Sequence, residues 1–140
     1  MEVAVNTEQV SPLALAYVGD AVYELFVRHY LIKKGVTKVN DLHREAVIFV
    51  RATTQAKIIH ELEQELTEVE RKIVKKGRNA KSGQIPKNTG TIEYRYSTGF
   101  ESLLGYLYLA GQQERLEEIL NRIPELVDKY QGKTVARSEI

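Results

Sequence analysis

The chain has 140 residues, which suits one domain, and 43% of them are hydrophobic, which is enough for a folded core. It has no cysteine, so disulfides, thiolate zinc sites, iron–sulfur clusters and cysteine nucleophiles are excluded. The net charge is only +1, no signal peptide opens the chain, and no uncharged stretch reaches the roughly 18 residues of a membrane span, so we expect a soluble, cytoplasmic protein without membrane contacts.

The first predicted helix is the most apolar segment of the chain. Ser11 and Pro12 predict its start, through a capping hydroxyl and a proline in the first turn. It continues to Ile32, and Gly35 ends it. Because its apolar residues cover nearly every face, we expect a central helix that is buried on most sides.

Shorter helices follow over about residues 40–50 and 53–66. Thr67 and Glu70 form a capping box that opens a fourth helix, and Gly77 is expected to stop it. The pattern is helical almost throughout, and the fold class that it predicts is all-α.

The C-terminal part predicts two more helices, from about Thr98 to Ala110 and over residues 113–130 with an interruption at Pro124. We expect one helical domain over residues 1–130, arranged around the N-terminal helix, and a flexible tail over residues 131–140.

Positive charge is concentrated between residues 71 and 95, where eight basic residues stand with one acid, Glu93. Residues 77–96 contain Gly, Asn, Ser and Pro without a sustained period, so we expect a long loop. Such a loop can turn tightly while its Lys and Arg side chains reach phosphates, although its spacing is not that of a P-loop. Alternatively, the basic loop is exposed to solvent and has no binding role.

Asp20 is unusual because it lies in the middle of the most apolar helix. A buried carboxylate needs a partner, a metal ion or a raised pKa. Glu24 and Arg28 follow at one-turn spacings and complete a polar stripe. An internal line of ion pairs and a functional carboxylate are both open interpretations.

Glu101 is a second acid in an otherwise apolar helix. Thr98 precedes it by three residues, so the pair also fits a capping box in which Glu101 bonds back to the cap amide. The residues alone leave the capping role and a functional role open.

Two segments carry a family resemblance. Residues 15–24 (LAYVGDAVYE) resemble the signature of the ribonuclease III family, and residues 100–109 (FESLLGYLYL) resemble its second acidic motif. The loop RNAKSG at 78–83 and the segment YRYST at 94–98 are similar to a narrower group, Mini-ribonuclease III. The resemblance covers about residues 10–125.

The resemblance implies an all-helical endonuclease domain that cleaves double-stranded RNA as a homodimer, without the C-terminal RNA-binding domain of longer family members. It implies precursor 23S ribosomal RNA as substrate, cut at a terminal duplex to leave 5′-phosphate and 3′-hydroxyl ends, and it leaves room for a ribosomal protein as helper. Asp20 and Glu101 would be catalytic and would bind Mg²⁺, with Mn²⁺ as a substitute. Glu24 and Thr98 would orient them, although an ion pair between Glu24 and Arg28 is an equal alternative.

Duplex RNA is recognised through its shape, its phosphates and its 2′-hydroxyls. The basic residues expected to contact phosphates are Lys75, Lys76, Arg78 and Lys81, with Lys87 and Arg95 behind them.

Two departures from the family pattern concern the site. Ala16 and Thr98 stand where longer family members have acids, so two of four carboxylates are kept. They support a rival hypothesis, a non-catalytic duplex-RNA-binding or ribosome-assembly protein with a degenerate nuclease site. A metal-dependent nucleotide hydrolase is a third possibility, but a long basic loop fits a polymer better.

Overall fold

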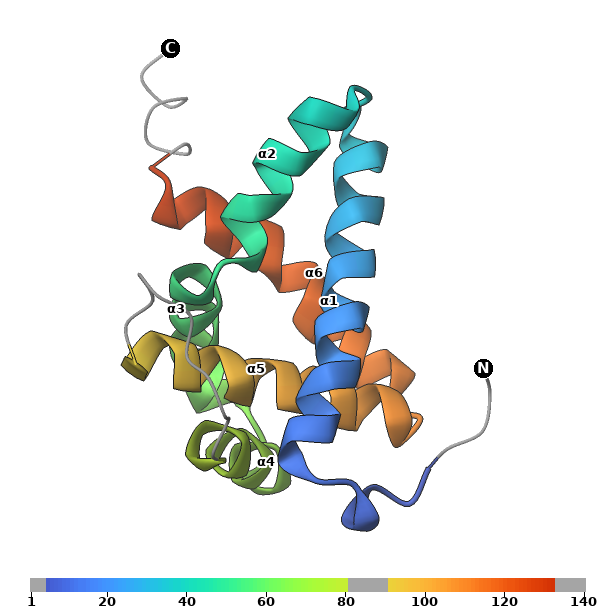
Figure 1. The fold of residues 1–140 in the computed structure, drawn as a ribbon, viewed down its shortest axis with the longest axis vertical. Coiled ribbons are helices and arrows are strands. Elements are labelled where there is room, and N and C mark those ends of the chain that lie inside the picture. Colours follow the sequence, from blue (N-terminus) through green and yellow to red (C-terminus); the bar gives the residue numbers. More distant parts are fainter. Residues whose placement is uncertain (1–4, 81–90, 133–140) are drawn as a thin grey trace.

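The computed structural model describes residues 5–80 and 91–132 (Figure 1). They form α1 (Pro12–Lys34), α2 (Val39–Val50), α3 (Ala52–Leu62), α4 (Glu68–Asn79), α5 (Thr91–Leu109) and α6 (Gln113–Tyr130), with short 3-10 turns at Thr7–Gln9 and Glu63–Glu65. No strand occurs in these two ranges, so the all-α class is confirmed. Lys81, Lys87 and most of the expected tail lie outside the described residues.

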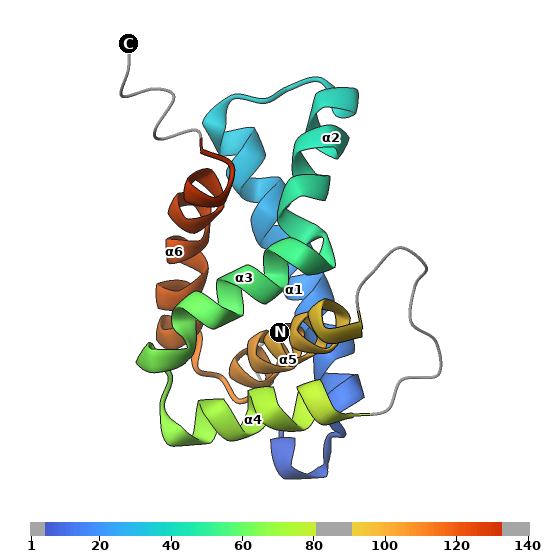
Figure 2. The same ribbon diagram turned by 90° about the vertical axis from the view of Figure 1, so that its left-hand side faces the viewer.

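The helices are arranged around the crossing of α1 and α5 (Figure 1). α1 runs along one side and turns back into α2, while α5 passes across it between α3 and α4 (Figure 2). α6 covers the other side of α3 and α5. No helix in the described ranges is long and apolar enough to cross a membrane.

α1 begins and ends where the sequence predicts. The Ser11 hydroxyl accepts a hydrogen bond from the amide of Ala14 at 3.1 Å, and Gly35 ends the helix with a φ of 108°. Burial on most sides was wrong, because Tyr17 is 82% exposed and Leu25 71% exposed. α1 therefore packs on the other helices with one face and leaves an apolar face uncovered.

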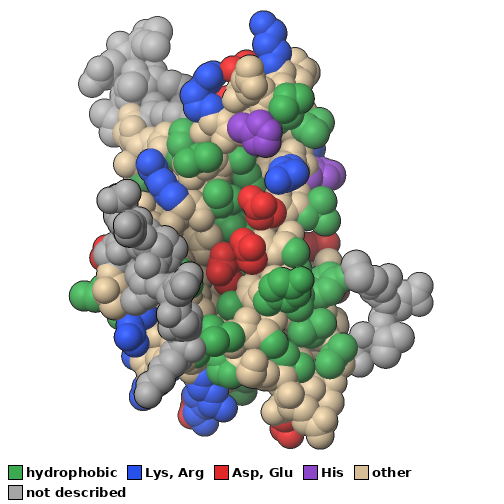
Figure 3. All heavy atoms as spheres, viewed as in Figure 1, with side chains coloured by type: hydrophobic (Ala, Val, Ile, Leu, Met, Phe, Trp, Pro, Cys, Tyr) green, Lys and Arg blue, Asp and Glu red, His purple; other side chains and the backbone are tan. Residues whose placement is uncertain are grey.

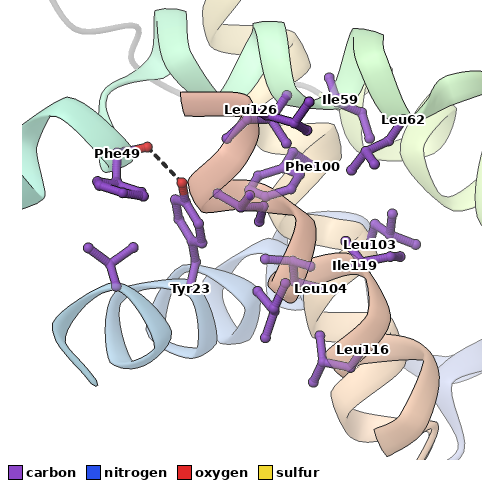
Figure 4. Packing of buried hydrophobic residues seen from close by; sticks show 14 of the residues in the cluster. Tyr23, Phe49, Ile59, Leu62, Phe100, Leu103, Leu104, Leu116, Ile119 and Leu126 are labelled. Carbon is purple, nitrogen blue, oxygen red and sulfur yellow. Dashed lines mark hydrogen bonds between the residues drawn. The ribbon is translucent and has the colours of Figure 1, made fainter. Parts of the chain in front are cut away.

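The core forms where α1, α3, α5 and α6 meet (Figure 4). Tyr23 and Phe100 are fully buried and pack edge to face, with ring centres 5.1 Å apart. The Tyr23 hydroxyl donates to the carbonyl of Phe49 at 2.8 Å, which joins α1 to α2 and satisfies the one polar atom of that side chain. Burial raises the pKa of Tyr23, which keeps this donor protonated.

A buried ion pair joins α4 to α6. Glu70 is only 3% exposed, and its two carboxylate oxygens each accept a hydrogen bond of 2.9 Å from Arg115. The same carboxylate closes the capping box with Thr67, as the sequence predicts. Although burial opposes it, these hydrogen bonds lower the pKa of Glu70.

The predicted loop over residues 77–96 is wrong at both ends. α4 continues through Gly77 to Asn79, and α5 already begins at Thr91. A Cβ atom at Gly77 would lie 2.4 Å from the Ser102 hydroxyl, so this glycine serves close packing of α4 on α5 rather than termination. The interruption expected at Pro124 is also absent from the described α6, which includes this proline.

Candidate active site

Two glycines bring α1 and α5 into backbone contact. A Cβ atom at Gly19 would lie 1.7 Å from the carbonyl oxygen of Glu101, and one at Gly105 would lie 1.9 Å from that of Leu15. No side chain fits at either position without separating the helices. Since Asp20 directly follows Gly19, this crossing places its carboxylate beside Glu101.

The Glu101 carboxylate interacts with the other polar side chains of the site. Its Oε2 accepts a hydrogen bond of 3.3 Å from the side-chain amide of Gln55, and it shares another with Asp20. Burial, followed by the negative charge of Asp20, raises the pKa of Glu101 to about 8. Two acidic side chains placed this close together favour a cation between them.

Asp20 is exposed, which corrects the expectation that it is buried. The polar stripe on α1 lies at the edge of the uncovered face, where the Asp20 carboxylate reaches solvent. The carboxylate that loses contact with water on folding is that of Glu101. Figure 3 shows acidic side chains gathered near the middle of this face, next to hydrophobic ones. The site is therefore open to a large ligand.

Glu24 forms the predicted ion pair with Arg28, at 3.6 Å and with both side chains exposed. Among the described residues it forms no hydrogen bond with Glu101, but its negative charge adds to the rise in the Glu101 pKa. Its role as an orienting residue stays a prediction.

The capping role considered for Glu101 is wrong. α5 begins at Thr91, so Thr98 and Glu101 both lie inside the helix. The Thr98 hydroxyl donates to the carbonyl of Tyr94 at 3.1 Å and makes no described contact with Glu101. Ala16 is buried and supplies no ligand. The carboxylate of Glu101 is thus not used in a helix cap and lies beside Asp20.

The donor set suits a hard cation. Among the described residues, no group of three or more His, Asp or Glu side chains is arranged to hold a metal ion. Mg²⁺ commonly binds to one or two carboxylates, together with waters and substrate phosphates. Asp20 and Glu101 therefore fit Mg²⁺ or Mn²⁺, because an open site leaves the other positions to water and RNA.

The expected RNA-binding residues fall into two described groups. Lys75, Lys76 and Arg95 are exposed near the facing ends of α4 and α5. Arg78 is half-buried instead, with its guanidinium 5.3 Å from the Tyr96 ring centre and a hydrogen bond of 3.2 Å to the Tyr96 hydroxyl. Figure 3 shows Lys and Arg side chains at the lower left, below the acidic ones. Positive charge thus borders the acidic site.

Sequence reasoning missed Gln55 as a site residue. It lies in the first turn of α3 and is 2% exposed. The available signal was its register, because it precedes the buried Ile59 by one turn and is the polar member of an apolar face. A polar residue at such a position needs hydrogen-bond partners, and one of them is Glu101.

Comparison with known proteins gives a consistent result. The model of the "Ribonuclease III domain" family matches residues 13–112. A protein named Mini-ribonuclease 3 from Symbiobacterium thermophilum is 52% identical over 126 residues, which cover 90% of this chain and 97% of that protein. A protein of the same name from Enterococcus faecalis is 51% identical over 116 residues, which cover 81% of this chain and 88% of that protein. A crystal structure of a protein from Fusobacterium nucleatum matches with a TM-score of 0.78 at 28% identity, over 87% of this chain and 98% of that one.

Proposed function

The chain belongs to the ribonuclease III family and is an endoribonuclease that acts on double-stranded RNA, and we propose that Asp20 and Glu101 are its catalytic, Mg²⁺-binding residues. We further propose that its substrate is precursor 23S ribosomal RNA in the cytoplasm, cut at a terminal duplex to leave 5′-phosphate and 3′-hydroxyl ends. The catalytic domain would span residues 1–130.

The observation that carries this proposal is the contact between Gly19 and the backbone of Glu101. Glycine in a helix interior costs about 0.5–1 kcal/mol relative to alanine, and crowding two carboxylates costs more. An arrangement that sets Asp20 against Glu101 at such a cost is typical of a functional site. A bound divalent cation would offset the repulsion.

The two carboxylates have different tasks in this proposal. Asp20 is exposed and faces the incoming RNA, while Glu101 is held in the wall of the site by its partners. Mg²⁺, when bound, would polarise a phosphoryl oxygen and lower the pKa of an attacking water. Lys75 and Lys76 would contact phosphates and fix the position of the duplex.

The uncovered face of α1 supports a homodimer, as is typical of the family. Tyr17 and Leu25 are large, apolar and strongly exposed on the face whose edge carries Asp20. Such a patch is typical of a protein interface. We infer that a second copy covers this face and that its site cuts the opposite strand.

Sedimentation would test the dimer. Tyr17→Glu should shift the protein to a monomer, because it places a charge in the interface. Val69→Glu is the matched control, since Val69 is also a strongly exposed apolar residue, at 53%, but belongs to α4. An unchanged dimer in the Tyr17 variant would exclude this face as the interface.

Cleavage assays would test the substrate. We expect staggered cuts in the terminal duplex of precursor 23S ribosomal RNA, with 5′-phosphates on the products and no turnover of free nucleotides. A ribosomal protein that binds this RNA should be added in parallel, because it would act as a helper by reshaping the duplex. Binding without cutting on all duplexes would contradict the proposal and favour a degenerate site, for which Ala16 and Thr98 would be the reason.

A further inference from the structure

Gln55 is buried where an amide side chain has a clear structural cost. Its Nε2 donates to the carbonyl of Val50 at 2.8 Å and to Oε2 of Glu101 at 3.3 Å, while its Oε1 is buried without a partner among the residues that the structure describes. A buried acceptor without a hydrogen bond destabilises the folded state, because it has lost its contacts with water. An apolar side chain would avoid that cost, so packing alone does not explain a glutamine here.

The orientation of this amide is fixed. Both hydrogen-bonding partners of Nε2 are acceptors, so turning the amide over would set Oε1 against the Val50 carbonyl and the Glu101 carboxylate. Val50 is the last residue of α2, and Gln55 lies in the first turn of α3. The amide is therefore anchored at the junction of two helices that carry neither Asp20 nor Glu101.

Glu101 reaches the site through a side chain with three rotatable bonds, and the neighbouring charge of Asp20 disfavours its ionised form. The Gln55 amide holds Oε2 of this carboxylate and so limits how the side chain can turn. Groups that orient metal ligands in this way commonly change metal affinity by about 10–100-fold when they are removed.

We propose that Gln55 is a positioning residue, whose buried amide holds the Glu101 carboxylate in the orientation that binds the divalent cation. This inference rests on the proposed function, because it takes Asp20 and Glu101 as the metal ligands. Gln55 itself touches neither the metal ion nor the RNA in this account.

The test measures the binding of Mn²⁺ to the metal-free protein in the absence of RNA. Electron paramagnetic resonance detects the Mn²⁺ that remains free in solution. In Gln55→Met the Kd for Mn²⁺ should rise about tenfold, because the donor to Glu101 is lost. Gln64→Met, at an exposed glutamine in the turn after α3, is the matched control and should bind as the wild type does. Gln55→Asn is a second variant, which keeps the amide but withdraws it by one methylene, and it should also weaken binding.

Two further readouts separate positioning from general damage. In a Glu101→Gln background, Gln55→Met should cause no further loss of Mn²⁺ affinity, since its effect passes through Glu101. In cleavage assays, the Mn²⁺ concentration for half-maximal rate should rise about tenfold, while the rate at saturating metal stays near that of the wild type.

The outcomes distinguish this inference from the proposed function. If Gln55→Met binds Mn²⁺ as tightly as the wild type while Asp20→Asn loses affinity, the positioning role is refuted and the metal site stands. An equal loss with and without the Glu101 carboxylate would also refute it. If the wild type itself binds no Mn²⁺, the proposed metal site fails, and this inference fails with it.

Discussion

Replacing Glu101 by glutamine should stabilise the metal-free protein at neutral and basic pH. The pKa of Glu101 rises from 4.5 to about 8 on folding, because the carboxyl group is buried and lies beside Asp20. Between these values the folded state binds more protons than the unfolded state, so the wild type loses stability as the pH rises. Glutamine resembles the protonated acid, since its oxygen can accept from Gln55 and its nitrogen can donate to Asp20.

The size of the effect follows from the same pKa. One pKa unit corresponds to about 1.4 kcal/mol, so between about pH 5 and about pH 8 the wild type should lose at most about 3.5 kcal/mol through this group. The gain from Glu101→Gln in the free energy of unfolding should grow over that range by up to the same amount. Asp20→Asn should give a smaller gain, because it removes the neighbouring charge but not the burial.

Urea unfolding in EDTA at several pH values measures this directly. Glu61→Gln is the control, because Glu61 is exposed on α3 away from the site. If the stability difference between Glu101→Gln and the wild type did not change with pH, the reasoning that burial and Asp20 penalise the Glu101 charge would be refuted.

Three other variants test the framework around the site. Gly19→Ala should destabilise the protein by about 2–3 kcal/mol and abolish cleavage, because the added methyl collides with the Glu101 carbonyl. If the variant were as stable in urea as the wild type, the two helices would be free to separate, which contradicts this reasoning. Glu70→Ala should lower the free energy of unfolding, measured by heat or urea, by about 3 kcal/mol, because it leaves the Arg115 guanidinium without its partner and removes a cap. A decrease below about 1 kcal/mol would show that this ion pair does little to hold α4 and α6 together. Lys76→Ala should weaken duplex-RNA binding and flatten the salt dependence by about one unit of slope if it removes one phosphate contact, whereas an unchanged slope would remove Lys76 from the interface.

The sequence predicts helix starts well where a local hydrogen bond decides them. Ser11 and Thr67 cap α1 and α4 as expected, because a hydroxyl that accepts from an amide three residues on is encoded within one turn. Gly35 ends α1 for a similarly local reason, its left-handed backbone. Such features depend little on the rest of the fold.

Errors arise where tertiary packing overrides local preference. Gly77 looks like a helix stop, yet it lies inside α4. The residue is a glycine because α5 packs against it too closely for a side chain. Thr98 and Glu101 have the spacing of a capping box, yet α5 begins at Thr91 and encloses both. The information that decides these cases lies in another helix and cannot be read from a local window.

The site shows the same division. Asp20 and Glu101 stand out in the sequence as acids among apolar residues, but the reason they meet is the Gly19 contact, which needs the relative placement of two helices. Gln55 comes from a third helix and becomes a candidate only when its amide is seen against the Glu101 carboxylate.

The most direct test of the central claim is cleavage of a labelled, perfectly paired RNA duplex, with Mg²⁺ and with EDTA, by the wild type, Asp20→Asn and Glu101→Gln. Asp41→Asn, at a surface aspartate paired with Arg44 on α2, is the control. We expect Mg²⁺-dependent cutting by the wild type and the control only, with duplex binding in EDTA retained by all four proteins. Full cleavage by either site variant would contradict the assignment of the active site to the Asp20–Glu101 pair.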